Sequence, residues 1–512
     1  MTPKHITVLG GGLTGLTAAY RLAERLPSTQ VVLLEATQRL GGWVDSHRYP
    51  IQYTSDGKDI RGEIVLEGGP RSIRPRGSRG AVKMLKLLQD LDLEGSIRPI
   101  PNSHPSARNR FLLGPSGSLQ ALPSSALSLL RSPYLRDLLF GGLTEPFRRR
   151  SLVLDESVDA FFRRRLGPAI ADKLASAMVH GIYAADSRDV SLRSAFPILH
   201  EAERKRGSIV LGMLLGTKSP EEKRSEKESW DELGPLGKER EGWSLYGLQG
   251  GLGTLTSRLA ERVRQLGVEV HLGNPVTALS MKDTNIEVST SENTVLTSRL
   301  VSALPPHRLA PLVTLPNLRS NPLTSVGVIN LVFPLPPAQV HPAGFGYLIP
   351  RSGPSQNPEG VLGVIFDSTA LDTEGEPPVC KLTVMMGGPY WSSYPSTSGR
   401  PMERPSNPTE LVSPALQHLR RVFPHLQDVE PVLIRPKLHI ECIPTYLPGH
   451  GGRLRELHEA ISSGPWKHKL SLVGSGYGGI GVNDCVGSAE EVVDALAQGH
   501  SATGLERWAD WS

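Results

Sequence analysis

Residues 5–15 read HITVLGGGLTG, a short apolar run that ends in a glycine-rich turn. The apolar run predicts a buried strand, and the periodic apolar residues after the turn predict a helix that ends near Leu26. Gly10 permits the tight turn, Gly12 lets backbone N–H groups approach a pyrophosphate, and Gly15 lets the helix pack closely against the strand. Since the helix N-terminus would then face an anion, the pattern predicts a phosphate-binding turn.

A second apolar run, 31–34, ends in an acidic residue, Glu35. Glu35 lies 20 positions after Gly15 (35 − 15), the spacing at which an acidic side chain meets a ribose hydroxyl in such strand–helix–strand units. A lone glycine motif is weak in a chain with 53 glycines, but here strand, helix, second strand and acid follow in order. The sequence therefore predicts a dinucleotide site.

Two further glycine-rich stretches favour a flavin over a nicotinamide dinucleotide. They are Arg39-Leu40-Gly41-Gly42-Trp43 and Glu67-Gly68-Gly69-Pro70-Arg71. Nicotinamide-binding folds have no need of them, whereas a long, extended FAD needs a second close backbone approach beyond the ribose. The alternative is an ordinary glycine turn without a ligand.

The stretch 470–484, LSLVGSGYGGIGVND, also has the GxGxxG spacing, at Gly474, Gly476 and Gly479. A second nucleotide unit would need a helix, a further strand and an acid after it, and we expect a single helix from Cys485 onward instead. The positive N-terminal end of that helix suits the negative charge that a flavin ring develops. We therefore expect this loop at the other end of the same cofactor.

Composition limits the remaining possibilities. A chain of 512 residues exceeds the size of one hydrophobic core, so two or three domains are expected. The net charge of +5 comes from 56 basic and 51 acidic residues that are mixed along the chain, which gives no nucleic-acid signature. Three separated cysteines and the absence of metal-binding spacings predict neither a disulfide framework nor a metal site.

The sequence also predicts no membrane-spanning segment, because no run approaches the about 18 apolar residues that a span requires. The first predicted strand starts at His5, which leaves no room for a leader, so we expect none.

Three stretches between the glycine motifs differ from globular core sequence. Residues 119–150 alternate leucine clusters with arginines and close on Arg148-Arg149-Arg150, which predicts either a membrane-surface helix or a helical cap on the core. The apolar and basic residues concerned are Leu127, Leu129, Leu130, Leu135, Leu138, Leu139, Phe140, Arg131 and Arg136. Residues 217–243 are dense in charge and predict a solvated loop, and 389–408 are rich in Ser and Pro.

The dinucleotide pattern resumes after the charged stretch. Residues 247–251, GLQGG, are expected to open a helix with apolar positions at Leu255, Leu259, Val263 and Leu266. Strands are predicted at 268–270, 276–279, 286–288 and 300–304. The cofactor domain is therefore expected to be assembled from separated pieces of sequence.

Taken together, these motifs resemble the oxygen-dependent protoporphyrinogen oxidases of the mitochondrial type, within the flavin amine oxidase-like superfamily. The resemblance rests on residues 10–15, 39–43, 67–75, 109–112 and 481–485, and extends to 164–168, 208–212 and 344–350. It implies an α/β architecture with a discontinuous Rossmann-like FAD-binding domain, a helical membrane-associating domain, a charged loop and a mixed-sheet α+β substrate domain. The implied boundaries are 1–90, 243–310 and 436–512 for FAD, 91–216 for the helical domain, 217–242 for the loop and 311–435 for the substrate.

The resemblance also implies an activity: oxidation of protoporphyrinogen IX to protoporphyrin IX by hydride transfer to flavin N5, with three O2 reduced to three H2O2. Positioning and environment, rather than an acid–base pair, would be the contribution of the protein. It further implies peripheral attachment to the mitochondrial inner membrane on the intermembrane-space side, a homodimer and a contact with ferrochelatase. A polyamine oxidase, a carotenoid desaturase and a flavin-free chaperone of prenylated GTPases with the same fold remain the alternatives.

By resemblance, Arg110 would clamp a substrate propionate, Arg71 would lie beside the flavin, and the macrocycle pocket would be lined by Gly181, Phe345, Leu348 and Met385. The residues expected to bind FAD non-covalently are Gly10, Gly11, Gly12, Leu13, Thr14, Gly15, Glu35, Ala36, Arg39, Gly42, Trp43, Gly69, Pro70, Arg71, Ser72, Val276, Gly479, Ile480, Gly481, Val482, Asn483 and Asp484.

Overall fold

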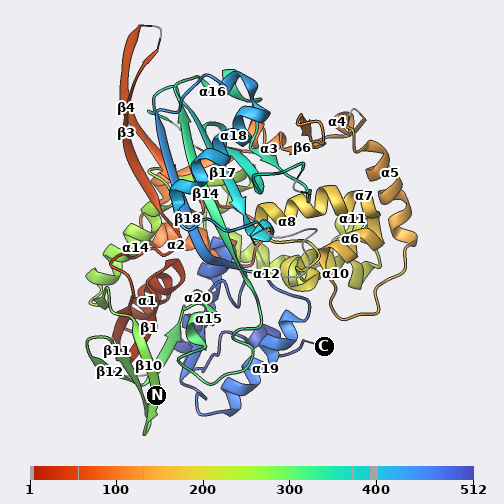
Figure 1. Cartoon of the computed structure of the whole chain (residues 1–512). Helices are drawn as coiled ribbons and strands as arrows, with labels where there is room; N and C mark the ends of the chain where they lie inside the picture. The colour runs from red at the N-terminus through yellow and green to blue at the C-terminus, as the bar shows by residue number, and fades with distance from the viewer. Residues whose placement is uncertain are drawn as a thin grey trace.

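The protein is described by a computed structural model that covers residues 5–55, 57–130, 132–353, 355–371, 374–391 and 402–511. Figure 1 shows two sheet-based regions, with a group of helices beside them that comes mainly from the first half of the chain. The C-terminal helices return to pack beside the N-terminal strand and helix.

The N-terminal strand lies in the middle of a five-stranded parallel sheet with the order β19-β13-β1-β2-β9. Its members are β1 (His5–Leu9), β2 (Gln30–Leu34), β9 (Glu269–His271), β13 (Arg299–Ser302) and β19 (Leu470–Leu472). The strands are apolar on both faces, as expected for a parallel sheet that is covered on both sides. Three separated segments of sequence thus build one sheet.

Different helices cover the two faces of this sheet. One face packs in a cluster with α1 (Leu13–Arg25), α2 (Ala81–Asp90), α14 (Gly253–Gln265) and α20 (Val482–Ala497). The other packs against α15 (Pro306–Leu309), α19 (His450–Ser463) and a small antiparallel sheet of β10 (Val276–Lys282), β11 (Asn285–Thr290) and β12 (Thr294–Thr297).

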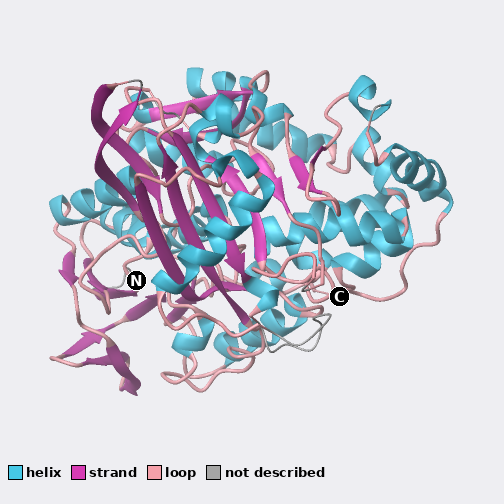
Figure 2. Cartoon of the chain, turned by 45° about the horizontal axis from the view of Figure 1, so that its top comes forward, coloured by secondary structure: helices cyan, strands magenta, loops and turns pink. Residues whose placement is uncertain are grey.

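Figure 2 shows the large mixed sheet of the second region in magenta. Its seven strands have the order β18-β14-β17-β16-β15-β6-β7. Its strands are β6 (Phe111–Leu113), β7 (Leu119–Ala121), β14 (Leu323–Phe333), β15 (Gly346–Leu348), β16 (Val361–Phe366), β17 (Cys380–Gly387) and β18 (Leu433–Pro444). All neighbours are antiparallel except β15 and β6. The helices of this region are α16 (Pro337–Val340), α17 (Asp367–Ala370) and α18 (Val412–Val422).

The helical unit lies beside the seven-stranded sheet (Figure 1). It comprises α4 (Ala126–Leu130), α5 (Leu135–Thr144), α6 (Val158–Leu166), α7 (Pro168–Ile170), the π-helical turn η3 (Ala171–Ala175), α8 (Ser176–Tyr183), α9 (Leu192–Ala195), α10 (Pro197–Arg206) and α11 (Ile209–Leu215). In the described part of the chain no helix combines the length and the hydropathy that a membrane crossing requires. Arg131 and the side chain of Leu127, both singled out above, lie outside the description, as do residues 392–401 of the Ser/Pro-rich stretch.

The charged stretch 217–242 is not a loop, which corrects the expectation from composition. It forms α12 (Pro220–Asp231) and α13 (Pro235–Glu239), and Ser219 and Glu222 make a reciprocal capping box at the start of α12. Trp230, Leu233 and Leu236 enter the core beneath. The segment has too few apolar residues for a helical period to show in its sequence, but these three apolar side chains are enough to anchor it on the core.

Other boundaries also differ from the expectations. Residues 243–248 form strand β8 (Trp243–Leu248), paired with β5 (Ile97–Pro101), so the expected helix begins only at Gly253. The last helix starts at Val482 rather than Cys485. The segment 91–216 is not purely helical, because it contributes the strands β5, β6 and β7 besides its helices, which include the short α3 (Pro105–Arg108). Sequence analysis also did not anticipate the long β3 (Ser46–Ser55) and β4 (Lys58–Glu67) hairpin.

Candidate active site

The turn between β1 and α1 has the geometry of an anion cradle. Gly10 has a φ of +93°, and a Cβ on Gly15 would lie 1.8 Å from the Gly10 carbonyl oxygen, so both positions require glycine. Gly12 is the N-cap of α1, yet no side chain caps this helix and no acid lies in its first turn. The helix N-terminus therefore offers its N–H groups and its positive dipole end to a phosphate.

The carboxylate of Glu35 is hydrogen-bonded to this turn. Its Oε2 accepts a hydrogen bond from the N–H of Gly11 over 2.7 Å, and its Oε1 accepts from the N–H and hydroxyl of Thr37 over 2.9 and 2.8 Å. The Glu35 carbonyl accepts from Asn274, two residues before Val276 at the start of β10. The carboxylate is thus held at the end of β2, where the spacing had predicted the ribose contact.

A second loop crosses the glycine turn at backbone distance. The N–H of Gly41 donates to the Gly11 carbonyl over 2.8 Å, and a Cβ on Gly42 would lie 3.0 Å from the Gly12 Cα. The guanidinium of Arg39 donates to backbone carbonyls of its own loop, including that of Val44 at 2.9 Å. Arg39 therefore holds the loop closed over the turn.

The segment 68–72 lies beside this loop. The N–H of Gly68 donates to the Asp45 carbonyl over 2.8 Å, and a Cβ on Gly69 would lie 2.0 Å from the Trp43 carbonyl oxygen. Burial alone would raise the pKa of the Asp45 carboxyl, but Lys437 and Arg435 bind it and hold its pKa well below the usual range. Trp43 and Gly69 are therefore held against β18 by an ion-pair cluster.

Arg71 leaves this segment and enters a buried polar network. Its guanidinium donates to Asp367 Oδ1 over 2.7 Å. Asp367 also accepts from the hydroxyl of Thr383, which in turn accepts from the Asn330 amide over 2.7 Å. The same amide donates to the Glu67 carbonyl over 3.1 Å. Asp367, which sequence analysis missed, thus joins the glycine-rich segment to the seven-stranded sheet.

The C-terminal glycine loop brings a second uncapped helix N-terminus to the same region. Gly479 has a φ of +136°, and Gly481 is the N-cap of α20 with no side-chain cap. The Asn483 amide donates to the Arg74 carbonyl over 2.9 Å, while its buried Oδ1 has no partner among the described residues. Burial raises the pKa of the neighbouring Asp484 carboxyl.

Both uncapped helices follow parallel strands of one sheet, α1 after β1 and α20 after β19. Their N-termini therefore lie at the carboxyl edge of the sheet, where α/β folds bind nucleotides. An anionic, extended cofactor fits two such ends, the crossing glycines and the unpartnered Asn483 oxygen. The predicted residues at 10–15, 35–36, 42–43, 69–72 and 479–484 are all brought to this edge or beside it.

Three of the four residues predicted to line the macrocycle pocket, Gly181, Leu348 and Met385, meet between α8 and the seven-stranded sheet, whereas Phe345 directly precedes β15 and is not part of this group. A Cβ on Gly181 would lie 2.8 Å from Leu348 Cδ2. Leu348 is opposite Gly363 in the sheet, and Gly363 is opposite Met385. This row continues to Val328. Gly363 and Val328, which were not anticipated, complete this row of apolar residues across the sheet.

Two arginines near this row have no counter-ion in the part of the chain that the structure describes. Arg110 precedes β6, and the neighbouring Asn109 carbonyl accepts from the N–H of Phe345 over 3.0 Å. Within the described chain, neither Arg110 nor Arg74 has a side-chain hydrogen bond or ion pair. Partial burial, followed by the charge of Arg74, lowers the pKa of the Arg110 guanidinium. Two adjacent cations without a carboxylate suit an anionic ligand; Arg74 lies in a motif quoted above but had no role there.

Comparison with known proteins agrees with this geometry. The model of the flavin containing amine oxidoreductase family matches residues 13–497. Protoporphyrinogen oxidase from Homo sapiens is 34% identical over 503 residues, covering 95% of this chain and 97% of the relative. Protoporphyrinogen oxidase from Schizosaccharomyces pombe is 33% identical over 96% of this chain and 98% of the relative. Cyclohexylamine oxidase from Brevibacterium oxydans shares the fold, with a TM-score of 0.60 and 16% identity over 97% of this chain and 99% of that one.

Proposed function

This chain belongs to the flavin containing amine oxidoreductases, and from this premise we propose that it oxidises protoporphyrinogen IX to protoporphyrin IX with FAD and O2. The reaction removes six hydrogen atoms from the substrate. Three O2 accept them and leave as three H2O2, so atoms and electrons balance over three two-electron rounds. The relatives that carry this activity are matched over nearly their whole length.

The observation that carries the proposal is the pairing of an apolar row with two arginines that have no counter-ion among the described residues. Leu348, Gly363 and Met385 form the row, and Arg110 and Arg74 supply the charges. A tetrapyrrole with two propionates offers a broad apolar disc and two anionic groups, which match this surface. An amine substrate would bring a cation instead, so the arginines disfavour a polyamine oxidase.

The cofactor role follows from the two helix N-termini. We propose that Gly10–Gly15 and the start of α1 hold the pyrophosphate of FAD, that Glu35 binds a ribose hydroxyl, and that 479–484 lie at the flavin end. Ala36, Gly42, Trp43 and Val276 are the remaining proposed contacts along the cofactor. When bound, FAD supplies the acceptor for hydride at N5 and passes electrons to O2.

The remaining work of this chain is positioning. Arg71 is held by Asp367 in a fixed orientation beside the cofactor cradle, which lets it orient groups there without transferring a proton. Leu348 packs directly on Gly181, so the two residues form one wall of the proposed pocket. We propose that this wall presses one face of the ring toward the flavin, and that Arg110 fixes the rotation of the ring by holding a propionate.

We also propose peripheral attachment to the mitochondrial inner membrane, on its intermembrane-space side. The helical unit exposes large apolar side chains around α5 and α11 next to the basic residues 148–150. The exposed apolar residues there are Leu130, Leu139, Phe140, Leu143, Phe147, Leu152, Val153, Leu154, Met213, Leu214 and Leu215. Apolar side chains beside arginines favour an anionic lipid surface. A homodimer and a contact with ferrochelatase remain proposals that come from the resemblance.

The test is aerobic incubation of purified, FAD-loaded protein with protoporphyrinogen IX, followed by porphyrin fluorescence and by H2O2 release. We expect three H2O2 for each porphyrin formed. Coproporphyrinogen III, with four propionates, is the matched alternative substrate, because the relative from Bacillus subtilis that is 24% identical is a coproporphyrinogen III oxidase. Faster oxidation of coproporphyrinogen, or of a polyamine, would contradict the proposal.

A further inference from the structure

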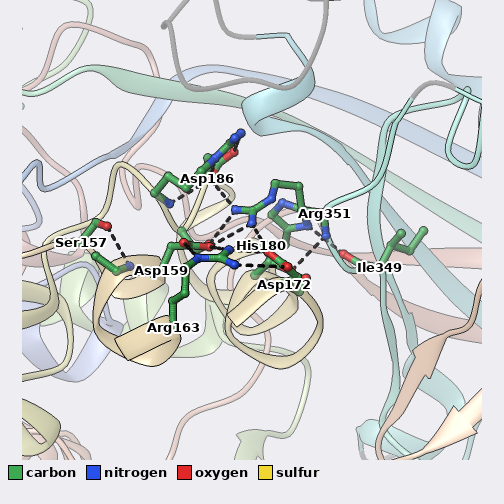
Figure 3. A network of polar contacts seen from close by, with 12 residues as sticks. Ser157, Asp159, Arg163, Asp172, His180, Asp186, Ile349 and Arg351 are labelled. Atoms are coloured by element: carbon green, nitrogen blue, oxygen red, sulfur yellow. Dashed lines mark hydrogen bonds and ion pairs between the residues drawn. The ribbon is translucent and has the colours of Figure 1, made fainter. Parts of the chain in front are cut away.

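The segment that follows β15 is bound to the helical unit by one arginine. The Arg351 guanidinium contacts Asp159 Oδ1 at 2.9 Å and Asp172 Oδ1 at 2.7 Å through one nitrogen, and Asp186 Oδ1 at 3.1 Å through another (Figure 3). These carboxylates come from α6, from the π-helical turn η3 and from the residues after α8. One side chain from the sheet region therefore ties together three parts of the helical unit.

The backbone of the same segment is held by α8. His180 Nδ1 lies 2.8 Å from the Ile349 carbonyl oxygen, and the N–H of Arg351 donates to the Ser176 hydroxyl over 3.0 Å. His180 is fully buried, and burial lowers the pKa of its imidazole, which favours the neutral ring that donates from Nδ1. The guanidinium and the backbone thus fix the segment from two directions.

No second arginine in this network can replace Arg351 as the link to the sheet. Arg163 also binds Asp159 and Asp172, at 3.0 and 2.6 Å, but it lies on α6. Arg188 binds Asp186 two residues away. Both neutralise the carboxylates from within the helical unit, whereas Arg351 reaches them from the sheet region. The side chains of Arg351, Asp159 and Asp186 are only 14%, 8% and 4% exposed, so solvent screens these two ion pairs weakly.

The position of this link matters because Leu348 and Gly181, which form one wall of the proposed pocket, adjoin it. Leu348 lies three residues before Arg351, and Gly181 directly follows His180. A Cβ on Gly181 would meet Leu348 at 2.8 Å, so the two residues are in contact and their packing has little tolerance. We propose that Arg351 is a positioning residue that holds Leu348 against Gly181, and thereby sets the position of this pocket wall and the affinity for the flat substrate, without touching the substrate.

This inference rests on the proposed function for its kinetic consequence. The planar fork of arginine can serve several carboxylates at once, whereas the single ammonium of lysine cannot hold three in the same geometry. Arg351→Gln should therefore loosen the contact between Leu348 and Gly181 most, and Arg351→Lys should recover part of the effect. Misplacement by 1 Å can reduce an enzyme's efficiency by about a hundredfold, so we expect a roughly tenfold rise in KM for a smaller shift.

The experiment compares Arg351→Gln with Arg163→Gln in the FAD-loaded full chain. The control removes an arginine from the same carboxylates but leaves the link to the sheet intact. We expect KM for protoporphyrinogen IX to rise about tenfold in Arg351→Gln, with kcat changed by less than about twofold, unchanged flavin absorbance, and wild-type KM in Arg163→Gln. Wild-type KM in a folded Arg351→Gln, or an equal rise in the control, would overturn the inference.

A second measurement separates this inference from the proposed function. Hydrogen–deuterium exchange of a peptide covering 345–351 reports the looseness of the segment without any substrate. We expect faster exchange in Arg351→Gln than in Arg163→Gln, even if the wild-type protein oxidised another substrate. Where Arg351→Gln fails to fold, Arg351→Lys takes its place in both measurements; unchanged exchange and unchanged KM in that variant would overturn the inference as well.

Discussion

The guanidinium of Arg71 and the carboxylate of Asp367 form a 2.7 Å ion pair across 296 residues of sequence. Their side chains are only 7% and 5% exposed. The pair joins the glycine-rich segment of the cofactor cradle to the end of strand β16, which borders the pocket. Two regions that could otherwise shift against each other are thereby held in one orientation.

Removing one partner of this pair should be strongly destabilising. Arg71→Met leaves the Asp367 carboxylate buried without its cation, which costs about 3–5 kcal/mol of unfolding free energy. Asp367→Leu should have a similar effect, because it leaves the Arg71 guanidinium buried without its anion. The double variant should lose much less unfolding free energy than the sum of the losses in the two single variants, and urea unfolding measures all three losses. Additive losses would show that the two side chains do not stabilise each other.

Glu35→Ala should release FAD. The substitution removes the carboxylate that binds Gly11 and Thr37 and is proposed to bind the ribose, a loss on the order of 1.5–3 kcal/mol for a charge-assisted hydrogen bond. Flavin absorbance after dialysis measures the outcome. Glu269→Gln, at an exposed carboxylate on the neighbouring strand β9, is the control and should stay yellow. Full flavin retention by Glu35→Ala would remove Glu35 from the site.

Arg110→Ala and Arg74→Ala should each weaken substrate binding while FAD stays bound. Each loses a charge-assisted contact with a propionate, about 1.5–3 kcal/mol, which corresponds to a rise in KM of roughly ten- to a hundredfold. Arg108→Ala, at an exposed arginine two residues from Arg110, is the control. The dimethyl ester of the substrate should be insensitive to both variants, and an equal loss with the ester would exclude the clamp.

Acidic substitutions in the exposed apolar surface should weaken membrane association. Leu214→Glu at the end of α11 removes a side chain that would enter the lipid, worth about 1.5–3 kcal/mol, and adds a repelled charge. Co-sedimentation with anionic phospholipid vesicles measures the change. Leu296→Glu, at an exposed leucine of β12 in the other region, serves as the matched control. Equal binding by both variants and the wild type would place the membrane contact elsewhere.

Acid should destabilise the protein through His450. Its ring is fully buried, stacks on Tyr446 with 4.2 Å between ring centroids, and places Nδ1 2.9 Å from the Asn321 amide nitrogen. Burial, with the charges of Arg453 and Arg507, lowers its pKa well below the ordinary value. The unfolded chain therefore takes up the proton first, so stability is complete above about pH 6.5 and falls below it, by at most about 1.4 kcal/mol per pH unit.

His450→Phe keeps the stacked ring and should flatten this part of the pH dependence. Urea unfolding between pH 7.5 and 5.5 measures it. The exposed His500 provides the comparison, because His500→Phe should leave the slope unchanged. An unaltered slope of unfolding free energy against pH in His450→Phe would mean that this histidine does not contribute to the acid destabilisation.

Local sequence predicted the strand, glycine turn and helix around residues 5–25 correctly because their determinants are local. The turn 10–15 and the strands around it follow from glycine conformation and strand periodicity, and the acid at Glu35 follows from spacing. The same reasoning failed for 217–242, where the helix is stabilised by a capping box and by three apolar side chains that dock on a distant core. A core surface formed by distant residues can stabilise a helix even when the sequence of that helix shows no apolar periodicity.

The sequence by itself determined the nucleotide-binding unit and its resemblance to a flavoenzyme family. Only the tertiary structure decided that Arg71 meets Asp367, that Gly363 completes the row between Leu348 and Met385, and that Arg351 reaches three carboxylates of the helical unit. Ion pairs and pocket walls depend on which surfaces meet in the folded chain. That meeting is set by the packing of whole sheets and helices, which no short stretch of sequence encodes.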